Sequence, residues 1–233
     1  MILIKLPRLS WDGKDLEDIY TVLQGAPELG FLYKASIRDH IRENESRGTL
    51  WAAYWDEQLV GVATIGSRRS YPHLTRHGEI TVIPEYRRRR IGTALYFVQI
   101  LQSLLEGRRE VEDTIIPELS PWMSGPTECQ EGIGFLPSLE YSLLGTLPRR
   151  TSGFKDIQLW GKCTYNLDRW LDRIPTNSDF ELLDTPKMRA TFEKNLKNYE
   201  NHDPDLVQTI QSCRDWIFET FQRVEVMQNE QEE

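Results

Sequence analysis

The sequence predicts an α/β (α+β) fold, with a central sheet, flanking helices and a helical extension at the C-terminus. Three observations lead to this class. A strand runs directly into a helix between residues 78 and 105, a β-hairpin spans residues 50–65, and two helices opened by proline follow residue 185. Because strands and helices alternate along the first part of the chain, we expect a sheet covered by helices.

The strand and the helix between residues 78 and 105 are indicated by two different periods. Residues 79–83 (Glu-Ile-Thr-Val-Ile) alternate, as the two faces of a pleated strand require. Pro84 cannot donate to a ladder and ends this strand. Apolar residues then recur at helical spacing, so a helix is expected to start at residues 89–91 and to present one stripe: Ile91, Leu95, Val98, Leu101 and Leu105.

The junction between this strand and this helix holds four consecutive arginines, Arg87 to Arg90, followed by Gly92. The first N–H groups of a helix have no acceptor within the helix, and the helix dipole is positive there. Guanidinium groups add further positive charge and bind phosphate well. Taken alone, an arginine run is typical of a solvated basic patch or a nucleic-acid contact. The strand, the proline and the helix around it favour a phosphate-binding loop instead.

The stretch PEYRRRRIGTAL resembles the PEYRGRGIGxAL stretch of the GCN5-related N-acetyltransferases, the GNAT superfamily. The resemblance implies that backbone N–H groups of the loop hold the pyrophosphate of acetyl-CoA, and that the preceding strand pairs with the pantetheine arm. Two arginines depart from the pattern, because Arg88 and Arg90 stand where glycines are usual and only glycine adopts positive φ freely. A frame read from Arg89, with Gly92 and Ala94, fits less well with Pro84. The implied cofactor-binding residues are Val82, Ile83, Arg87, Arg88, Arg89, Arg90, Ile91, Gly92 and Thr93.

The resemblance covers residues 1–147 and implies the GNAT fold, with a mixed, mostly antiparallel central sheet. The hairpin LWAAYWDEQLVGVATI is similar to the second and third strands of that family. Residues 1–147 are therefore expected to form an acetyl-CoA-binding domain, and residues 148–233 a C-terminal extension.

Glu79 is the candidate general base, because several family members place a catalytic glutamate on this strand and an amine must lose a proton to react. A glutamate that is exposed or paired with a cation at the start of a strand is the alternative. The tyrosine that the family uses as general acid is replaced here by Gln130, and an asparagine by Met123. Tyr141, or solvent, would then protonate the thiolate, although Tyr141 also fits as a residue of the sheet.

The composition limits the partners of this chain. Its 233 residues carry a formal net charge of −8, which disfavours a broad nucleic-acid surface and would attract cationic amines, either small molecules or proteins. No metal-ligand cluster is evident, and three widely spaced cysteines argue against a disulfide framework. No stretch is long and apolar enough to cross a membrane, and the N-terminal apolar run is too short for a signal peptide, so a cytoplasmic protein is expected.

The remaining segments are assigned from local patterns. Residues 1–6 predict an edge strand, and residues 66–77 a polar loop. Helices are expected over residues 16–23 and 31–45, and further strands over residues 113–119, 140–144 and 157–165, the last of which extends the sheet or crosses to a partner.

The C-terminal extension should end in a helical hairpin, because Thr185-Pro186 and Asp203-Pro204 each combine an N-cap with a first-turn proline. The simplest use of its apolar stripe is to pack on the rest of the chain. A homodimer contact is the second alternative, and a lid over the acceptor is the third. Two functions follow. The first is an acetyl-CoA-dependent N-acetyltransferase with an amine acceptor, and the second is an inactive GNAT-like module that binds acyl-CoA or a protein.

Overall fold

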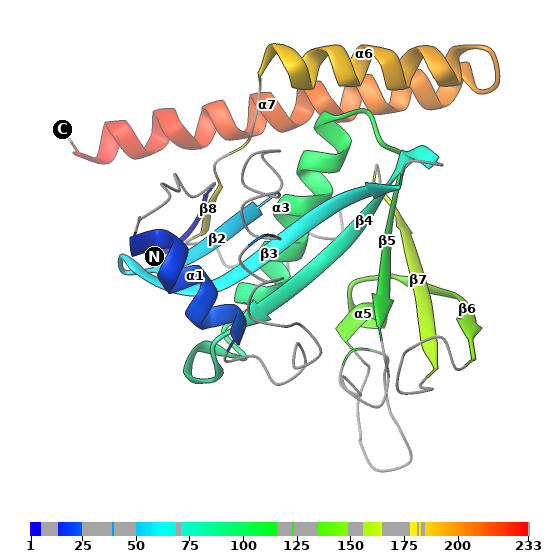
Figure 1. The fold of residues 1–233 in the computed structure, drawn as a ribbon. Helices are drawn as coiled ribbons and strands as arrows, with labels where there is room; N and C mark the ends of the chain where they lie inside the picture. Colours follow the sequence, from blue (N-terminus) through cyan, green and yellow to red (C-terminus); the bar gives the residue numbers. More distant parts are fainter. Residues whose placement is uncertain are drawn as a thin grey trace.

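The computed structural model contains one eight-stranded sheet with the order β6-β7-β5-β4-β3-β2-β1-β8 (Figure 1). It describes residues 1–5, 14–24, 39, 50–68, 71–115, 123, 135–148, 156–164, 178–180, 182 and 185–232. Within the described residues most neighbouring strands are antiparallel, and the pairs β4·β5 and β1·β8 are parallel. The fold is therefore the expected α/β class with a mixed, mostly antiparallel sheet.

The first strand, β1 (Ile2–Lys5), was expected at the edge of the sheet, and this is wrong. It pairs with β2 (Leu50–Trp55) on one side and with β8 (Ser178–Phe180) on the other. The partner β8 lies more than 170 positions later in the sequence, which no local pattern could reveal. The far end of the chain thus supplies the edge strand.

A hairpin joins β2 to β3 (Gln58–Arg68), as the sequence predicted. Asp56 and Glu57 in its turn have φ of 47° and 69°, which is the left-handed conformation that a tight two-residue hairpin needs. The polar loop expected over residues 66–77 is instead part of a second hairpin, because β3 continues to Arg68 and β4 (Tyr71–Val82) begins three residues later. The strands pair through this polar stretch although its sequence has no apolar alternation that would predict a strand.

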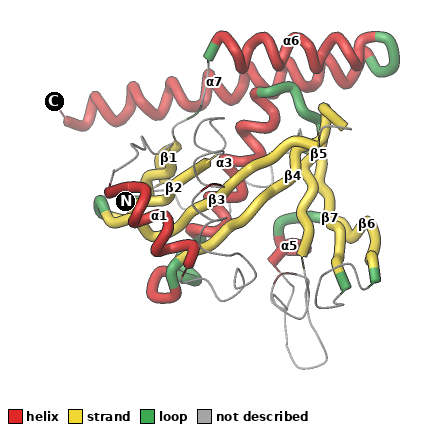
Figure 2. Tube along the Cα trace, viewed as in Figure 1, coloured by secondary structure: helices red, strands yellow, loops and turns green. Residues whose placement is uncertain are grey.

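Two helices cover opposite faces of the sheet (Figures 1 and 2). The predicted helix α3 (Ile91–Leu105) is buried along nearly its whole length against one face. On the other face, α1 (Lys14–Gln24) buries Leu16, Ile19 and Leu23 against β2 and β3. The second predicted helix, residues 31–45, lies outside the described residues except for residue 39.

Beyond α3, the chain forms β5 (Glu110–Ile115), the short helix α5 (Phe135–Ser138), β6 (Ser142–Leu147) and β7 (Ile157–Cys163). The strand β5 starts three residues before the predicted one. The strand β7 lies between β5 and β6, so the segment predicted over residues 157–165 extends the sheet. Residues after 148 therefore contribute two strands to the sheet that residues 1–147 begin.

The predicted helical hairpin is formed by α6 (Pro186–Glu200) and α7 (Pro204–Glu232). Each helix has the predicted cap, since Thr185 Oγ1 accepts from the Met188 N–H at 3.2 Å and Asp203 Oδ1 from the Leu206 N–H at 3.0 Å. The hairpin lies across the C-terminal end of α3 (Figure 1). Its apolar side chains join the main core cluster, which includes Phe192, Leu196, Tyr199, Leu206, Ile210 and Ile217.

A glycine permits this close packing. Gly107, just after α3, has a φ of +69°, and a Cβ there would lie 3.1 Å from the carbonyl oxygen of Phe192. Asn195 on α6 also donates to the Glu106 carbonyl oxygen at 2.6 Å. The first of the three uses expected for the helical hairpin, packing on the rest of the chain, is thus confirmed for the described side chains.

Within the described residues, none of the helices has both the length and the apolar character needed to cross a bilayer. The described part of the chain also holds no group of three or more histidine, cysteine, aspartate or glutamate residues placed to bind a metal ion.

Candidate active site

The parallel strands β4 and β5 pair over a short length and then separate. Their register runs from Leu74 opposite Glu110 to Arg76 opposite Glu112. Beyond this point the two strands diverge (Figure 1), and β5 continues with β7 as its partner. The lower part of β4 therefore has an edge that β5 leaves open, where an extended ligand can add as a strand.

The backbone of Val82 faces this open edge. The N–H of the next residue, Ile83, donates to the Val60 carbonyl oxygen on β3 at 2.9 Å. Since backbone groups of successive residues in a strand point to opposite sides, the N–H and carbonyl groups of Val82 point away from β3. Of Val82 and Ile83, which are both expected to bind the cofactor, only Val82 has its N–H directed at the open edge, because the N–H of Ile83 donates within the sheet.

A β-bulge interrupts β4 a few residues earlier. Ala63 is opposite Ile80 and Ile65 is opposite His77, so β4 carries one extra residue in the interval that contains Glu79. The carbonyl oxygen of Thr64, opposite the bulge, accepts a hydrogen bond of 2.8 Å from the side chain of Gln99 on α3. Bulges redirect backbone and side chains and are frequent beside active sites. The side chain of Glu79 lies outside the part that the structure describes.

The loop from β4 to α3 keeps a left-handed path in spite of its arginines. A 3-10 turn, Pro84–Tyr86, follows the strand, and then Arg88 and Arg90 each have a φ of 62°. This region costs a residue other than glycine about 1–2 kcal/mol. The glycine positions of the resemblance are thus occupied by arginines that adopt the backbone conformation glycine adopts freely.

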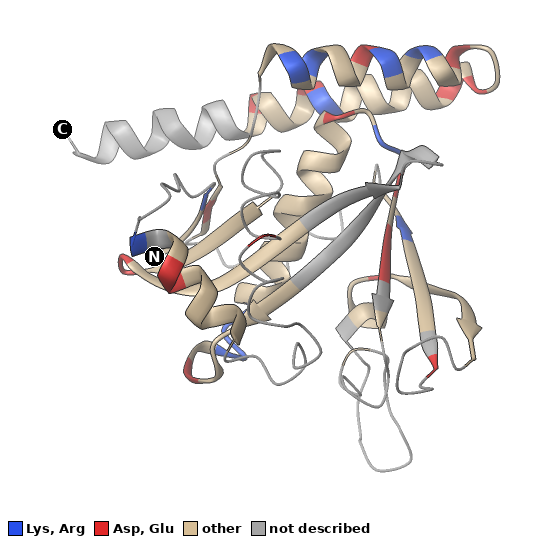
Figure 3. Ribbon diagram, viewed as in Figure 1, with Lys and Arg blue, Asp and Glu red and all other residues tan. Residues whose placement is uncertain are grey.

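The N-terminus of α3 carries no side-chain cap. Its N-cap residue, Arg90, makes no capping hydrogen bond, and the first turn has no acidic residue. The first helical bond runs from the Ala94 N–H to the Arg90 carbonyl oxygen at 3.0 Å, so the N–H groups of Ile91, Gly92 and Thr93 precede the helical ladder. In Figure 3 the arginines colour this loop blue. Uncapped N–H groups, the helix dipole and the arginine cluster together favour an anion.

Two of the four arginines are bound within the fold. The Nε of Arg87 donates to the Val82 carbonyl oxygen at 2.9 Å. The guanidinium of Arg89 lies 5.1 Å from the ring centroids of both Trp55 and Tyr86, which is within the range of cation–π attraction. These contacts attach the loop to β4 and to the β2–β3 hairpin.

A pocket of about 600 Å³ opens between α1 and the end of β4. It brings together three of the residues predicted to bind the cofactor, namely Val82, Ile83 and Arg87. Lys14 and Asp18 of α1 and the turn of the β2–β3 hairpin also line it. The pocket therefore adjoins both the end of the open edge and the loop between β4 and α3.

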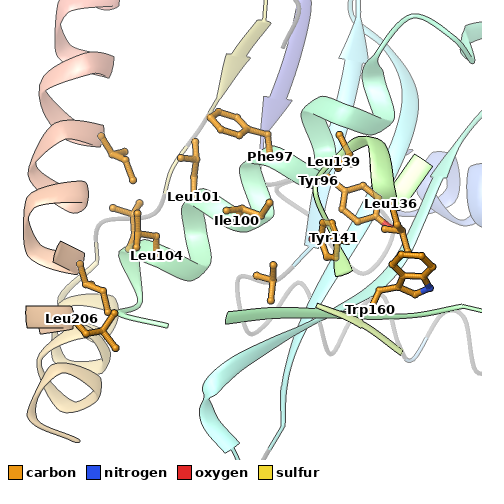
Figure 4. Close-up of a cluster of buried hydrophobic side chains, with 14 of the residues drawn as sticks. Tyr96, Phe97, Ile100, Leu101, Leu104, Leu136, Leu139, Tyr141, Trp160 and Leu206 are labelled. Carbon is orange, nitrogen blue, oxygen red and sulfur yellow. The ribbon is translucent and has the colours of Figure 1, made fainter. Parts of the chain in front are cut away.

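Tyr141, the candidate acid, precedes β6 and is buried in the main core cluster (Figure 4). Its ring lies edge-on to that of Tyr96 with centroids 6.0 Å apart, and the Tyr96 hydroxyl donates to Asp113 on β5. Burial raises the pKa of both phenols well above the usual value, and the nearby Asp113 carboxylate raises each pKa further. Both tyrosines are therefore protonated at neutral pH.

Other predicted site residues are only partly described. Gln130 lies outside the described residues, and Met123 is 7% exposed within the core cluster. Gln99 and Asp113 were not identified from the sequence; they are buried polar residues that are hydrogen-bonded to Thr64 and Tyr96, respectively. A glutamine within a largely apolar helix and an aspartate in a strand are the signals that could have identified them, because buried polar groups need partners.

Residues 15–106 match the family model for the acetyltransferase (GNAT) family. Comparison with curated protein sequences found no match.

Several solved acetyltransferase structures share the fold at low sequence identity. The ribosomal-protein-S18-alanine N-acetyltransferase of Escherichia coli superposes with a TM-score of 0.52 at 15% identity, over 70% of this chain and 94% of that one. A putative GNAT acetyltransferase of Desulfovibrio desulfuricans gives 0.55 at 15% identity, over 70% and 99%. A putative acetyltransferase of Salmonella typhimurium, solved with acetyl-CoA, gives 0.52 at 12% identity, over 70% and 94%.

Proposed function

We propose that this chain transfers an acetyl group from acetyl-CoA to an amine, using residues 15–106, which match the family model for the acetyltransferase (GNAT) family. One observation carries the proposal. The open edge of β4 leads through a left-handed loop into the uncapped N-terminus of α3, so a strand-like arm and a diphosphate could be bound in sequence.

The residues present fit acetyl-CoA. The N–H groups of Ile91, Gly92 and Thr93 would hold the pyrophosphate, with the arginines of the loop beside them, and the edge of β4 at Val82 would hold the pantetheine arm. Bound there, acetyl-CoA supplies an acetyl group activated as a thioester. The N–H of Val82 is the donor proposed to polarise the thioester carbonyl.

Two side chains are proposed to move protons during transfer. The amine nitrogen bonds to the carbonyl carbon while the bond from that carbon to sulfur breaks. Glu79, in the bulge of β4, would accept the proton that the nitrogen loses, directly or through water. Tyr141, which burial keeps protonated, is the proposed donor of the proton that the leaving sulfur gains.

The acceptor is an amine carried by a small molecule or a protein. The net charge of −8 supports a cationic acceptor, since an acidic body attracts positive charge. We also propose a cytoplasmic location, because Cys163 and Cys213 are free thiols, as a reducing compartment maintains them.

A homodimer through the C-terminal helices is a further part of the proposal. The apolar side chains described for α6 and α7 lie in the main core cluster, so a second copy would contact other surfaces of these helices. Light scattering tests this directly. A mass near 27.3 kDa would argue against the dimer, and twice that mass would support it.

The proposal is tested by calorimetric titration with acetyl-CoA and free CoA, followed by an assay of thiol release with a panel of amines. Saturable binding and release that depends on the amine would support the enzyme. The variant Gly92→Trp, which fills the first turn of α3, should abolish binding and leave the circular dichroism spectrum unchanged. Unchanged affinity in that variant would contradict the loop assignment.

A second function is favoured by the replacement of the expected acid by Gln130 and by the burial of Tyr141. The chain would then bind acyl-CoA without turnover and act through a protein partner. Saturable binding with no thiol release from any amine of the panel would select this alternative.

A further inference from the structure

Arg88 and Arg90 differ from the other two arginines of the loop. Arg87 binds the Val82 carbonyl oxygen, and Arg89 lies over two aromatic rings. Arg88 and Arg90 are both exposed. Among the residues that the structure describes, their guanidinium groups make no hydrogen bond, ion pair or ring contact.

The same two residues carry the unfavourable backbone conformation of the loop. Each has a φ of 62°, a conformation in which glycine would be free of strain. A glycine at either position would thus give the same path at lower cost. Strain that the fold does not need, at the edge of a candidate site, points to a role for the side chain.

The guanidinium groups of Arg88 and Arg90 have no described partner, and acetyl-CoA carries an anionic group besides its pyrophosphate. The pyrophosphate can be met by the N–H groups at the start of α3 and by the helix dipole. Acetyl-CoA carries one more anionic group, the 3′-phosphate of its ribose, which is a phosphate monoester. Guanidinium groups bind such a phosphate through paired, charge-assisted hydrogen bonds.

We propose that Arg88 and Arg90 recognise the 3′-phosphate of the acyl donor and make the chain select CoA thioesters over donors that lack this phosphate. This inference rests on the proposed function and specifies its donor. Glycine would fit the left-handed backbone at positions 88 and 90 better than arginine does. A role of the side chains in the choice of donor explains why arginine is present there.

The test compares acetyl-CoA with acetyl-dephospho-CoA, which differ only in the 3′-phosphate. Calorimetry would give the dissociation constants of both for the wild type and for the double variant Arg88→Gly, Arg90→Gly. Because glycine adopts positive φ freely, this variant keeps the path of the loop. The exposed Arg189 on α6, changed to Gln, is the matched control for lost positive charge.

We expect the wild type to prefer acetyl-CoA by about tenfold or more, as hydrogen bonds between charged groups would give. The double variant should lose this preference, so that its affinity falls more for acetyl-CoA than for acetyl-dephospho-CoA, and the control should behave as the wild type. Equal affinity of the wild type for both donors, or a preference that persists in the double variant, would overturn the inference alone.

Failure of the wild type to bind either donor would overturn the proposed function and this inference together. A titration with a short DNA duplex tests the alternative that the two arginines bind nucleic acid, which also carries phosphates. If the wild type bound the duplex, lost it in the double variant, and showed no donor preference, the two arginines would be nucleic-acid contacts, and the inference would be wrong.

Discussion

The side chain of Gln99 donates to the backbone carbonyl oxygen of Thr64 at 2.8 Å, which joins the middle of α3 to the position opposite the bulge of β4. The register between β3 and β4 passes from Ala63, opposite Ile80, to Ile65, opposite His77, so Thr64 lies opposite the bulge. A helix side chain is thus bonded to the sheet at the position of the bulge.

Replacement of Gln99 by leucine should therefore destabilise the chain and impair the site. The side chain is fully buried, and removal of one partner leaves a buried carbonyl oxygen without this hydrogen bond, which costs about 1–3 kcal/mol. Urea unfolding measures the loss. Turnover should fall as well, since the bulge would lose its support.

The exposed Gln208 on α7, changed to leucine, is the control and should alter stability by about 0.5 kcal/mol or less. Equal stability of the Gln99→Leu variant and the wild type would show that water or the backbone satisfies Thr64.

The single variants Arg88→Gly and Arg90→Gly should each stabilise the chain. Both arginines have a φ of 62°, and relief of the left-handed conformation is worth about 1 kcal/mol, reduced by the greater freedom of glycine in the unfolded chain. Thermal or urea unfolding measures the gain. Arg189→Gly, in the ordinary helical backbone of α6, should have the opposite sign and cost about 1 kcal/mol. A loss of stability in the two loop variants would mean that their side chains support the fold.

The parts of the structure that the sequence predicted are those with local causes. Pro84 and the change from an alternating to a helical period placed the start of α3 within two residues, and the Thr185 and Asp203 caps opened α6 and α7 as expected. These features depend on residues a few positions apart.

The features that sequence analysis missed depend on distant pairings. The bulge at Glu79 is visible only against β3, and β1 is internal only because β8 returns to it. The left-handed conformation of Arg88 and Arg90 could not be inferred from the residue type, because arginine gives no sign of positive φ. The resemblance supplied the loop, but the side-chain partners of each arginine had to come from the structure.

Stability should fall as the pH rises above about 10. Burial raises the pKa of Tyr96 and Tyr141 well above that of an unfolded tyrosine. The unfolded chain then releases these protons at a lower pH than the folded chain does, so their contribution is complete below pH 10 and is lost as the pH rises toward the folded pKa. The slope is about 1.4 kcal/mol per pH unit for each tyrosine.

Urea unfolding at a series of alkaline pH values measures this slope. Tyr141→Phe and Tyr96→Phe should each reduce the slope. Glu200→Gln, an exposed substitution that leaves both tyrosines in place, should not change it. An identical slope in the phenylalanine variants would mean that both phenols ionise normally.

Tyr141→Phe should also lower turnover while the affinity for acetyl-CoA stays the same. A general acid contributes about 100-fold or more to a rate, and phenylalanine keeps the ring packed against Tyr96. Steady-state thiol release gives kcat, and calorimetry gives the affinity. If kcat were unchanged, Tyr141 would be a residue of the core alone, and solvent would protonate the sulfur.

Glu79→Gln should reduce kcat by about 100-fold or more, with little change in acetyl-CoA affinity, because glutamine keeps the size of the side chain but cannot accept the proton of the amine. The reduction should shrink as the pH rises toward the pKa of the acceptor amine, since more of the amine is then already deprotonated. Glu200→Gln, exposed at the end of α6, is the matched control. The pH profile separates the two roles left open for Glu79. A base gives a defect that depends on pH, whereas a glutamate that is only exposed or paired with a cation leaves kcat and its pH dependence as in the wild type.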